Sequence, residues 1–196
     1  MINRELYMEQ ITPFIDKPFV KVITGIRRCG KSVVLRLIRE ELLRRGVSED
    51  YIIYMNFESF EWIDMKEAKA LYAHIREATK ASGKYYILLD EIQEVTDWEK
   101  AVNAFLVDLD VDIYVTGSNS RLLSSEFSTY LAGRYVAFHI MTLSFREYLL
   151  FHDLPLTISV SDRKTEFLKY LRMGGFPAIH TANYDYNAIY KIVYED

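Results

Sequence analysis

The chain is 196 residues long, carries a formal net charge of −4, and is 50% hydrophobic and 27% charged. This length and apolar content predict a domain with its own core and exclude a disordered tail. No apolar run reaches the roughly 18 residues that a membrane helix needs, so we expect no membrane partner. The negative charge argues against a basic nucleic-acid-binding face as the main feature. The single cysteine, Cys29, excludes an internal disulfide and, with no signal peptide in view, predicts a cytoplasmic protein.

Short apolar runs alternate with helical patterns along most of the chain. The apolar runs predict strands at residues 19–24, 51–57, 85–89, 112–116 and 134–141. Amphipathic patterns between them predict helices at residues 31–45, 66–81 and 98–106. Continuously apolar strands separated by helices are typical of a parallel sheet covered on both faces. The sequence therefore predicts an α/β fold with three layers.

The pattern becomes wholly helical towards the end of the sequence. Ser144 and Glu147 have the spacing of a capping box at a helix start, and a further helix is expected at residues 162–173. The sequence stops in mid-pattern, without a cap or a turn, which predicts that it is a piece of a longer chain. The predicted parts are an α/β domain at residues 1–142 and a small helical subdomain at residues 143–196.

One loop carries the Walker A pattern G-x-x-x-x-G-K-[ST], which cradles phosphate groups. We expect nucleotide binding by Gly25, Ile26, Arg27, Arg28, Cys29, Gly30, Lys31, Ser32 and Val33. The two glycines let backbone N–H groups face a triphosphate, Lys31 reaches the β- and γ-phosphates, and the Ser32 hydroxyl binds Mg²⁺. The loop falls between a predicted strand and a predicted helix, whose N-terminus favours the same anion.

Other chemistry at this loop stays open but is only weakly indicated. The loop could be an ordinary turn from strand to helix with an incidental lysine. Cys29 could be a reactive thiol rather than a residue that fills a variable position.

The four histidines are scattered without ligand spacing to the cysteine, which argues against a zinc site.

Two carboxylates directly follow the third predicted strand. Asp90 and Glu91 have the Walker B arrangement, in which the first carboxylate holds magnesium and the second acts as general base towards the attacking water. Asp90 is expected to approach Ser32 and the metal, and Glu91 to face the γ-phosphate. The simpler alternative is that both carboxylates only stabilise the start of the next helix.

The fourth predicted strand ends in small polar residues, Thr116, Ser118 and Asn119. One of them is expected near the γ-phosphate, where a hydrogen bond can distinguish ATP from ADP. We take Ser118 as the candidate, although the sequence does not decide among the three. An N-cap role for the following helix would explain them as well. Asn56, at the end of the second strand, could hold Glu91 aside until a partner binds.

An arginine often stabilises the charge that develops on the γ-phosphoryl group in the transition state. Arg134, directly after Gly133, is the first candidate for this catalytic role. Its rivals are Arg121, Arg27 and Arg28. A surface salt bridge is the ordinary alternative for each of them.

Six segments of the sequence together carry a family resemblance. They are residues 25–32, Leu88-Leu89-Asp90-Glu91-Ile92-Gln93, Thr116-Gly117-Ser118, Gly133-Arg134, Leu143-Ser144-Phe145-Arg146-Glu147-Tyr148 and Gly174-Gly175-Phe176-Pro177. They resemble the AAA-type ATPase domain of a widespread prokaryotic family, which a nuclease-like C-terminal domain of unknown function usually follows. The resemblance implies a three-layer P-loop NTPase fold with sheet order 5-1-4-3-2, with ATP and Mg²⁺ as cofactors. It also implies that the missing C-terminal domain is a partner of this part.

The sequence thus predicts an enzyme that binds and hydrolyses ATP with Mg²⁺ and so drives or gates the missing domain. A small-molecule kinase is an alternative that shares the loop, but no arginine-bearing lid is evident. The other alternative is a nucleotide switch that does not hydrolyse, within a DNA-handling or signalling complex. Self-association stays open, and so does a nucleic-acid partner, which the charge does not support.

Overall fold

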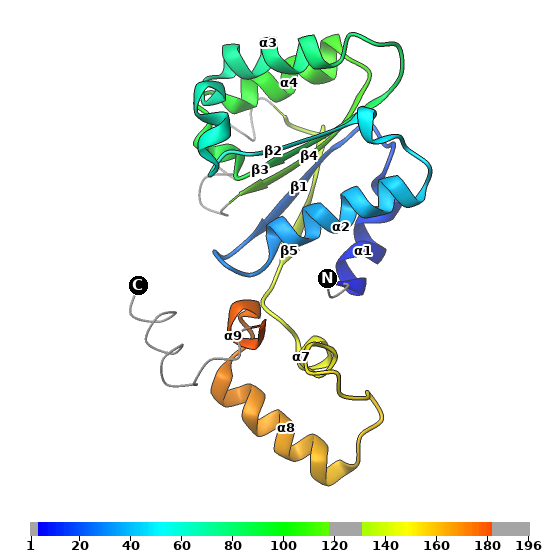
Figure 1. The fold of residues 1–196 in the computed structure, drawn as a ribbon, viewed down its shortest axis with the longest axis vertical. Helices are drawn as coiled ribbons and strands as arrows, with labels where there is room; N and C mark the ends of the chain where they lie inside the picture. Colours follow the sequence, from blue (N-terminus) through cyan, green and yellow to red (C-terminus); the bar gives the residue numbers. More distant parts are fainter. Residues whose placement is uncertain (1–3, 118–130, 182–196) are drawn as a thin grey trace. The chain divides into compact units, whose positions relative to one another are not determined.

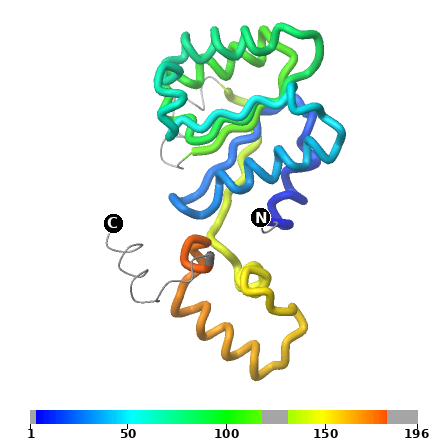
Figure 2. Tube along the Cα trace, viewed as in Figure 1, coloured from blue at the N-terminus to red at the C-terminus, as the bar shows by residue number. Residues whose placement is uncertain are grey.

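The computed structural model describes residues 4–117 and 131–181, and Figure 1 shows a parallel sheet at the centre of its α/β part. The strands are β1 Val20–Gly25, β2 Ile52–Asn56, β3 Tyr85–Asp90, β4 Val111–Gly117 and β5 Tyr135–Ile140. Their order is β2-β3-β4-β1-β5, and every neighbouring pair is parallel. The tube in Figure 2 shows β1 running between β4 and β5. The α/β class and the expected order 5-1-4-3-2 are confirmed.

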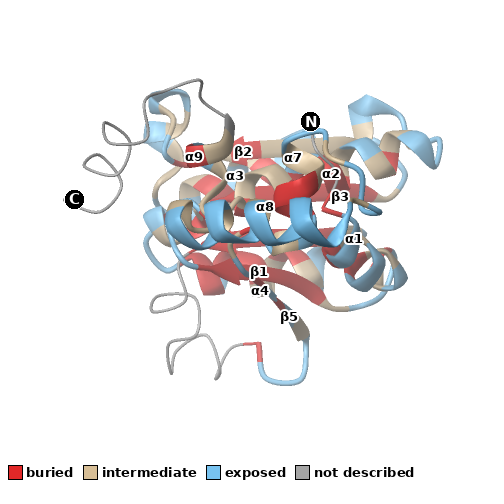
Figure 3. Ribbon diagram, turned by 90° about the horizontal axis from the view of Figure 1, so that it is seen from below, coloured by how far each residue is buried: buried red, intermediate tan, exposed pale blue. Residues whose placement is uncertain are grey.

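Helices cover both faces of this sheet and bury it. α2 (Lys31–Arg44), with α1 (Glu5–Ile11) beside it, lies on one face, and α3 (Ala68–Ala78) and α4 (Trp98–Asp108) lie on the other (Figure 1). Every residue of β1 and β3 is buried, and Figure 3 shows β1 as a continuous buried ribbon. This is why these strands read as unbroken apolar runs.

One helix was not predicted, and several helix ends differ from the sequence prediction by one to three residues. α1 was not predicted, and α3 ends at Ala78 rather than at residue 81. The Thr79 hydroxyl donates to the carbonyl of Ile75 and so competes with continuation of the α3 helix. Short 3₁₀ turns complete this part at Thr12–Phe14, Glu49–Tyr51, Phe60–Met65 and Ile92–Glu94.

A buried polar network lies near the amino ends of β1 and β4. Lys21 forms an ion pair with Asp112, and both side chains are almost fully buried. The second oxygen of Asp112 accepts from the Asp16 amide at 2.9 Å and from the Tyr114 hydroxyl at 2.7 Å. Burial lowers the pKa of Lys21, which the charge of Asp112 partly offsets. Because each buried polar group has a partner, the network fixes how these strands pair.

Packing divides the chain into two units. One contains residues 5–26 and 31–140, including the whole sheet. Among the described residues, the other brings together Arg4, residues 27–30 and residues 141–181. The extents predicted for the two domains stay a prediction.

The second unit contains α7 (Phe145–Phe151), α8 (Val160–Met173) and α9 (Pro177–Thr181). α7 begins with the expected capping box, because Ser144 and Glu147 bond each other's backbone N–H groups. α8 begins two residues earlier than predicted, with Ser159 as its N-cap. Across the two described ranges, no helix combines the length and the apolar character that crossing a membrane requires.

Candidate active site

The loop with the Walker A pattern joins the end of β1 to the start of α2. Gly25 and Gly30 have φ angles of +154° and +104°, a region that favours glycine because it has no Cβ. Cys29 is buried, whereas Ile26, Arg27 and Arg28 are exposed. The loop therefore needs its glycines where the pattern places them. Gly25, Gly30, Lys31 and Ser32 stand at the fixed positions of the pattern, and Val33 follows on α2.

Lys31 and Ser32 form the first turn of α2, where the free N–H groups of the helix carry partial positive charge. The Lys31 side chain is buried, and its Nζ lies 3.4 Å from the carbonyl oxygen of Ile26 and 3.5 Å from Oε1 of Glu91. Lys31 thus lies between the loop backbone and the second carboxylate of the Walker B pair.

Asp90 is a fully buried carboxylate at the end of β3. Its Oδ1 accepts hydrogen bonds from the Ser32 hydroxyl at 3.1 Å and the Thr116 hydroxyl at 2.5 Å. Its Oδ2 accepts from the Tyr54 hydroxyl at 3.0 Å. Burial and the Asp90 charge raise the pKa of Tyr54, so this phenol stays protonated and donates. The structure therefore brings the two expected metal ligands, Ser32 and Asp90, side by side.

Thr116 connects both Walker B carboxylates. Its hydroxyl donates to Asp90 and accepts from the backbone N–H of Glu91 at 3.0 Å, so both of its hydrogen-bonding roles are used. Ser118, Asn119 and Arg121 lie outside the described residues, and the choice of sensor stays a prediction.

Glu91 adopts a left-handed backbone conformation with φ of +55°, which is uncommon for a residue with a side chain. Its Oε1 faces Lys31, and its Oε2 accepts from Nε2 of Gln93 at 2.5 Å. Gln93 Oε1 is buried and has no hydrogen-bond partner within the described ranges. Asn56 Oδ1 instead accepts from the Glu58 amide. Gln93, rather than Asn56, is therefore the amide that contacts Glu91.

Arg134 lies at the opposite edge of the sheet from the loop. Its backbone carbonyl accepts from the N–H of Val20, the first residue of β1, whereas Gly25 ends that strand. A strand of this length spans roughly 17–20 Å. The Arg134 guanidinium donates to Oδ1 of Asn103 at 3.2 Å. Arg134 is thus too far away to act on a phosphate held by its own loop.

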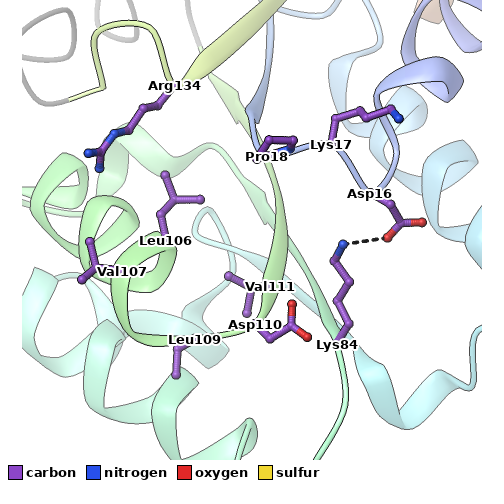
Figure 4. A pocket seen from close by; sticks show the side chains of 10 residues that line it. All are labelled: Asp16, Lys17, Pro18, Lys84, Leu106, Val107, Leu109, Asp110, Val111 and Arg134. Atoms are coloured by element: carbon purple, nitrogen blue, oxygen red, sulfur yellow. Dashed lines mark ion pairs between the residues drawn. The ribbon is translucent and has the colours of Figure 1, made fainter.

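Figure 4 shows Arg134 at the border of an open pocket of about 510 Å³. The other lining residues precede β1, β3 and β4, belong to α4 or begin β4; they are Asp16, Lys17, Pro18, Lys84, Leu106, Val107, Leu109, Asp110 and Val111. Asp16 and Lys84 form an ion pair at 3.0 Å. This pocket lies at the amino edge of the sheet, so it is not the phosphate site.

Sequence reasoning missed two side chains of the site, Tyr54 and Gln93. Tyr54 lies inside an apolar strand two residues from its end, where an aromatic residue is an ordinary core residue. Gln93 lies two residues after Glu91, and the sequence indicates no role of its own for it. Only the left-handed turn at Glu91 brings it back towards the carboxylate.

The profile of the family AAA_14, described as an AAA domain, matches residues 17–149. The chain belongs to this AAA family. It carries an AAA-type P-loop ATPase domain, as the sequence resemblance implied.

Two curated relatives of this AAA domain are both uncharacterized proteins. The one from Haemophilus influenzae is 43% identical over 93% of this chain and 46% of the relative. The other, MJ1544 from Methanocaldococcus jannaschii, is 35% identical over 91% of this chain and 39% of the relative. The chain thus spans less than half the length of each of these relatives.

Solved structures of similar fold include AMPPCP-bound DnaA from Aquifex aeolicus, with a TM-score of 0.59 at 15% identity over 98% of this chain and 62% of that chain. Hsp104 with ATPγS and casein gives a TM-score of 0.57 at 12% identity over 91% of this chain and 36% of that chain. The Orc1 protein of Aeropyrum pernix with DNA gives 0.52 at 17% identity over 85% of this chain and 50% of that chain. At these identities the likeness shows the fold alone.

The hydroxyl of Thr116 can be tested by a matched pair of substitutions. Thr116→Val should leave the Glu91 N–H without a partner and remove one of the two hydrogen bonds to Asp90 Oδ1, which costs about 1–3 kcal/mol of unfolding free energy. Thr116→Ser keeps the hydroxyl and should cost clearly less. Urea unfolding followed by circular dichroism measures both variants. If the valine variant were as stable as the wild type, the bonds assigned to Thr116 would be wrong.

Proposed function

We propose that this AAA domain binds and hydrolyses ATP with Mg²⁺, and that hydrolysis drives or gates a partner region of a longer protein. The observation that carries this proposal is the junction of Ser32, Lys31, Asp90 and Glu91 at the carboxyl edge of the sheet. Walker A and Walker B residues meet there in the arrangement that phosphoryl transfer requires.

The oxygen ligands suit a magnesium ion. Ser32 Oγ and Asp90 Oδ1 lie 3.1 Å apart, and hydroxyl and carboxylate oxygens are the ligands that this hard cation prefers. These two residues would hold the ion, directly or through water. When bound, Mg²⁺ neutralises charge that develops on the β- and γ-phosphate oxygens.

Lys31 has two roles in this proposal. A triphosphate in the loop competes with the Ile26 carbonyl and with Glu91 for the Lys31 ammonium group, since all three are acceptors of the same donor. Binding therefore separates Lys31 from Glu91. The released carboxylate is then available to a water molecule.

Glu91 acts as general base on that water. As the water oxygen bonds the γ-phosphorus, its proton passes to the Glu91 carboxylate and the bond from phosphorus to the bridging oxygen breaks, which yields ADP and phosphate. Gln93 holds Oε2 of Glu91 and so orients the other oxygen. The wild-type chain without nucleotide keeps this base occupied by Lys31.

Arg134 serves the nucleotide of another copy of the chain. Its position at the amino edge of the sheet keeps it from its own loop, and it borders an open pocket (Figure 4). An arginine supplied by a neighbouring molecule is a recognised way to stabilise transition-state charge in P-loop enzymes. We therefore place the complete active site between two copies.

The relatives' greater length supports a partner region in the same polypeptide. The matched part covers 46% and 39% of the two curated relatives, so more than half of each lies beyond the match. That remaining part is our candidate for the element that ATP hydrolysis drives. Its nuclease-like character stays a prediction.

Two substitutions distinguish the role of Glu91 in hydrolysis from the role of Lys31 in nucleotide binding. Glu91→Gln should keep ATP affinity within a few-fold but lower turnover by about 10²–10⁴, because the amide cannot accept the proton. Lys31→Ala should lose both binding and turnover. Glu94→Gln, an exposed carboxylate in the following 3₁₀ turn, is the matched control and should leave both unchanged. Phosphate release and calorimetric titration measure the two quantities. Normal turnover by the Glu91 variant would remove it as the base.

If Arg134 acts on the nucleotide of another copy, two inactive variants should restore activity when they are mixed. Arg134→Ala retains an intact phosphate loop, and Lys31→Ala retains the arginine. Each alone should hydrolyse ATP at least about 10²-fold more slowly than wild type. A mixture of the two should recover activity, and wild-type turnover per molecule should rise with protein concentration. A mixture that stays inactive, with wild-type turnover independent of concentration, would contradict a shared site.

A further inference from the structure

Arg4 is a buried arginine in the segment directly before α1. Its side chain is only 2% exposed, and it is one of the largest fully buried side chains among the described residues. Nothing in the proposed hydrolysis uses it. A buried guanidinium is costly unless its donors are satisfied, so its partners indicate what it does.

The donors of Arg4 reach three separate segments of the second packing unit. Nε donates to Oε1 of Glu147 at 2.5 Å, Nη1 to the carbonyl oxygen of Cys29 at 3.0 Å, and Nη2 to the carbonyl oxygen of Met141 at 2.9 Å. One guanidinium thus joins the phosphate loop, the residue after β5 and the first turn of α7. We call this group the Arg4 cluster: Arg4, Cys29, Met141 and Glu147.

Glu147 connects the Arg4 cluster to the start of α7. Its Oε1 accepts from Arg4, and its Oε2 accepts from the backbone N–H of Ser144 at 2.8 Å and from the Ser144 hydroxyl at 2.9 Å. Both carboxylate oxygens are therefore engaged. A shift of the guanidinium has to move the capped end of α7 or break one of these bonds.

At the loop, the bond to Cys29 fixes the orientation of a peptide group. A trans peptide places C=O and N–H on opposite sides, and the described residues contain no cis peptide. A donor that holds the Cys29 carbonyl therefore directs the N–H of Gly30 the other way. In the Walker A pattern that N–H is one of the donors to phosphate.

Gly30 also lies directly against the guanidinium. A Cβ at this position would stand 3.3 Å from Nη1 of Arg4, and the φ of +104° disfavours any side chain. The backbone conformation therefore favours glycine here, and a Cβ would also crowd the neighbouring guanidinium. Arg4 thus contacts the loop at two neighbouring residues, Cys29 and Gly30.

Stability alone does not account for a buried ion pair. Taking both charges out of water costs about as much free energy as their attraction returns, so such pairs add little net stability. Arginine is also the only side chain whose planar fork can serve three diverging acceptors, whereas lysine has a single compact charge. A role that needs this geometry explains the residue better than a contribution to stability.

We propose that Arg4 is a positioning residue that orients the Gly30 N–H towards bound phosphate and transmits the state of the loop to α7. Phosphate that draws the loop inward pulls on the Cys29 carbonyl, and the guanidinium passes that displacement to Glu147 and the first turn of α7. This inference rests on the proposed nucleotide binding. It names the route by which the loop reaches the helical unit.

The first test measures the affinity of the full chain for a non-hydrolysable ATP analogue with Mg²⁺ by calorimetry. Arg4→Lys, which keeps the charge, and Arg4→Ala should both bind about tenfold or more weakly than wild type, whereas Ser144→Ala should bind within about twofold. Ser144→Ala is the matched control because it removes the α7 cap but leaves the Arg4–Glu147 pair. If Arg4→Ala does not fold, the affinity is measured for Arg4→Lys and Glu147→Gln instead.

The second test follows hydrogen exchange of the α7 amides with and without saturating analogue. In wild type the analogue should change exchange at residues 145–151 by at least about fivefold. In Arg4→Lys saturated with the analogue, exchange at these residues should stay the same as without it. If Arg4→Lys bound the analogue as tightly as wild type and its α7 exchange changed as much as in wild type, this inference alone would be overturned. A folded wild type that binds no analogue would overturn the proposed function and this inference together.

Discussion

The rest of the site depends on the hydrogen bond between Ser32 and Asp90. These residues are 58 positions apart, and only the parallel order with β1 and β3 on either side of β4 brings the loop and the carboxylate to one edge. Because Asp90 is fully buried, its charge has to be met by donors. Ser32, Thr116 and Tyr54 provide them, and each comes from a different element. A cation at this point would replace a bond that the fold has already arranged.

The direction of the parallel strands places two groups of residues at opposite ends of the sheet. Residues that follow strands gather at the carboxyl edge, where Lys31, Asp90 and Glu91 meet. Residues that precede strands gather at the amino edge, where Arg134 borders the open pocket. One chain therefore carries the binding residues on one edge and the arginine on the other. This separation is consistent with the proposed site shared between two copies.

Much of the fold could be predicted because its signals are local. Each strand is an apolar run, and the Walker patterns fix Lys31 and Asp90 by spacing. The contacts of Tyr54 and Gln93 could not be predicted, because they depend on which way a side chain faces and on the left-handed turn at Glu91. Arg4 has no local signal, since its partners lie 25 to 143 residues away. The domain extents and the individual catalytic roles stay predictions.

The most direct test of the central claim is a calorimetric titration of the wild-type chain with a non-hydrolysable ATP analogue, in the presence and absence of Mg²⁺. We expect binding that Mg²⁺ strengthens by at least about tenfold, and an Asp90→Asn variant in which that gain is lost. A folded chain that gives no binding heat at millimolar nucleotide, or whose affinity does not depend on magnesium, would contradict the account.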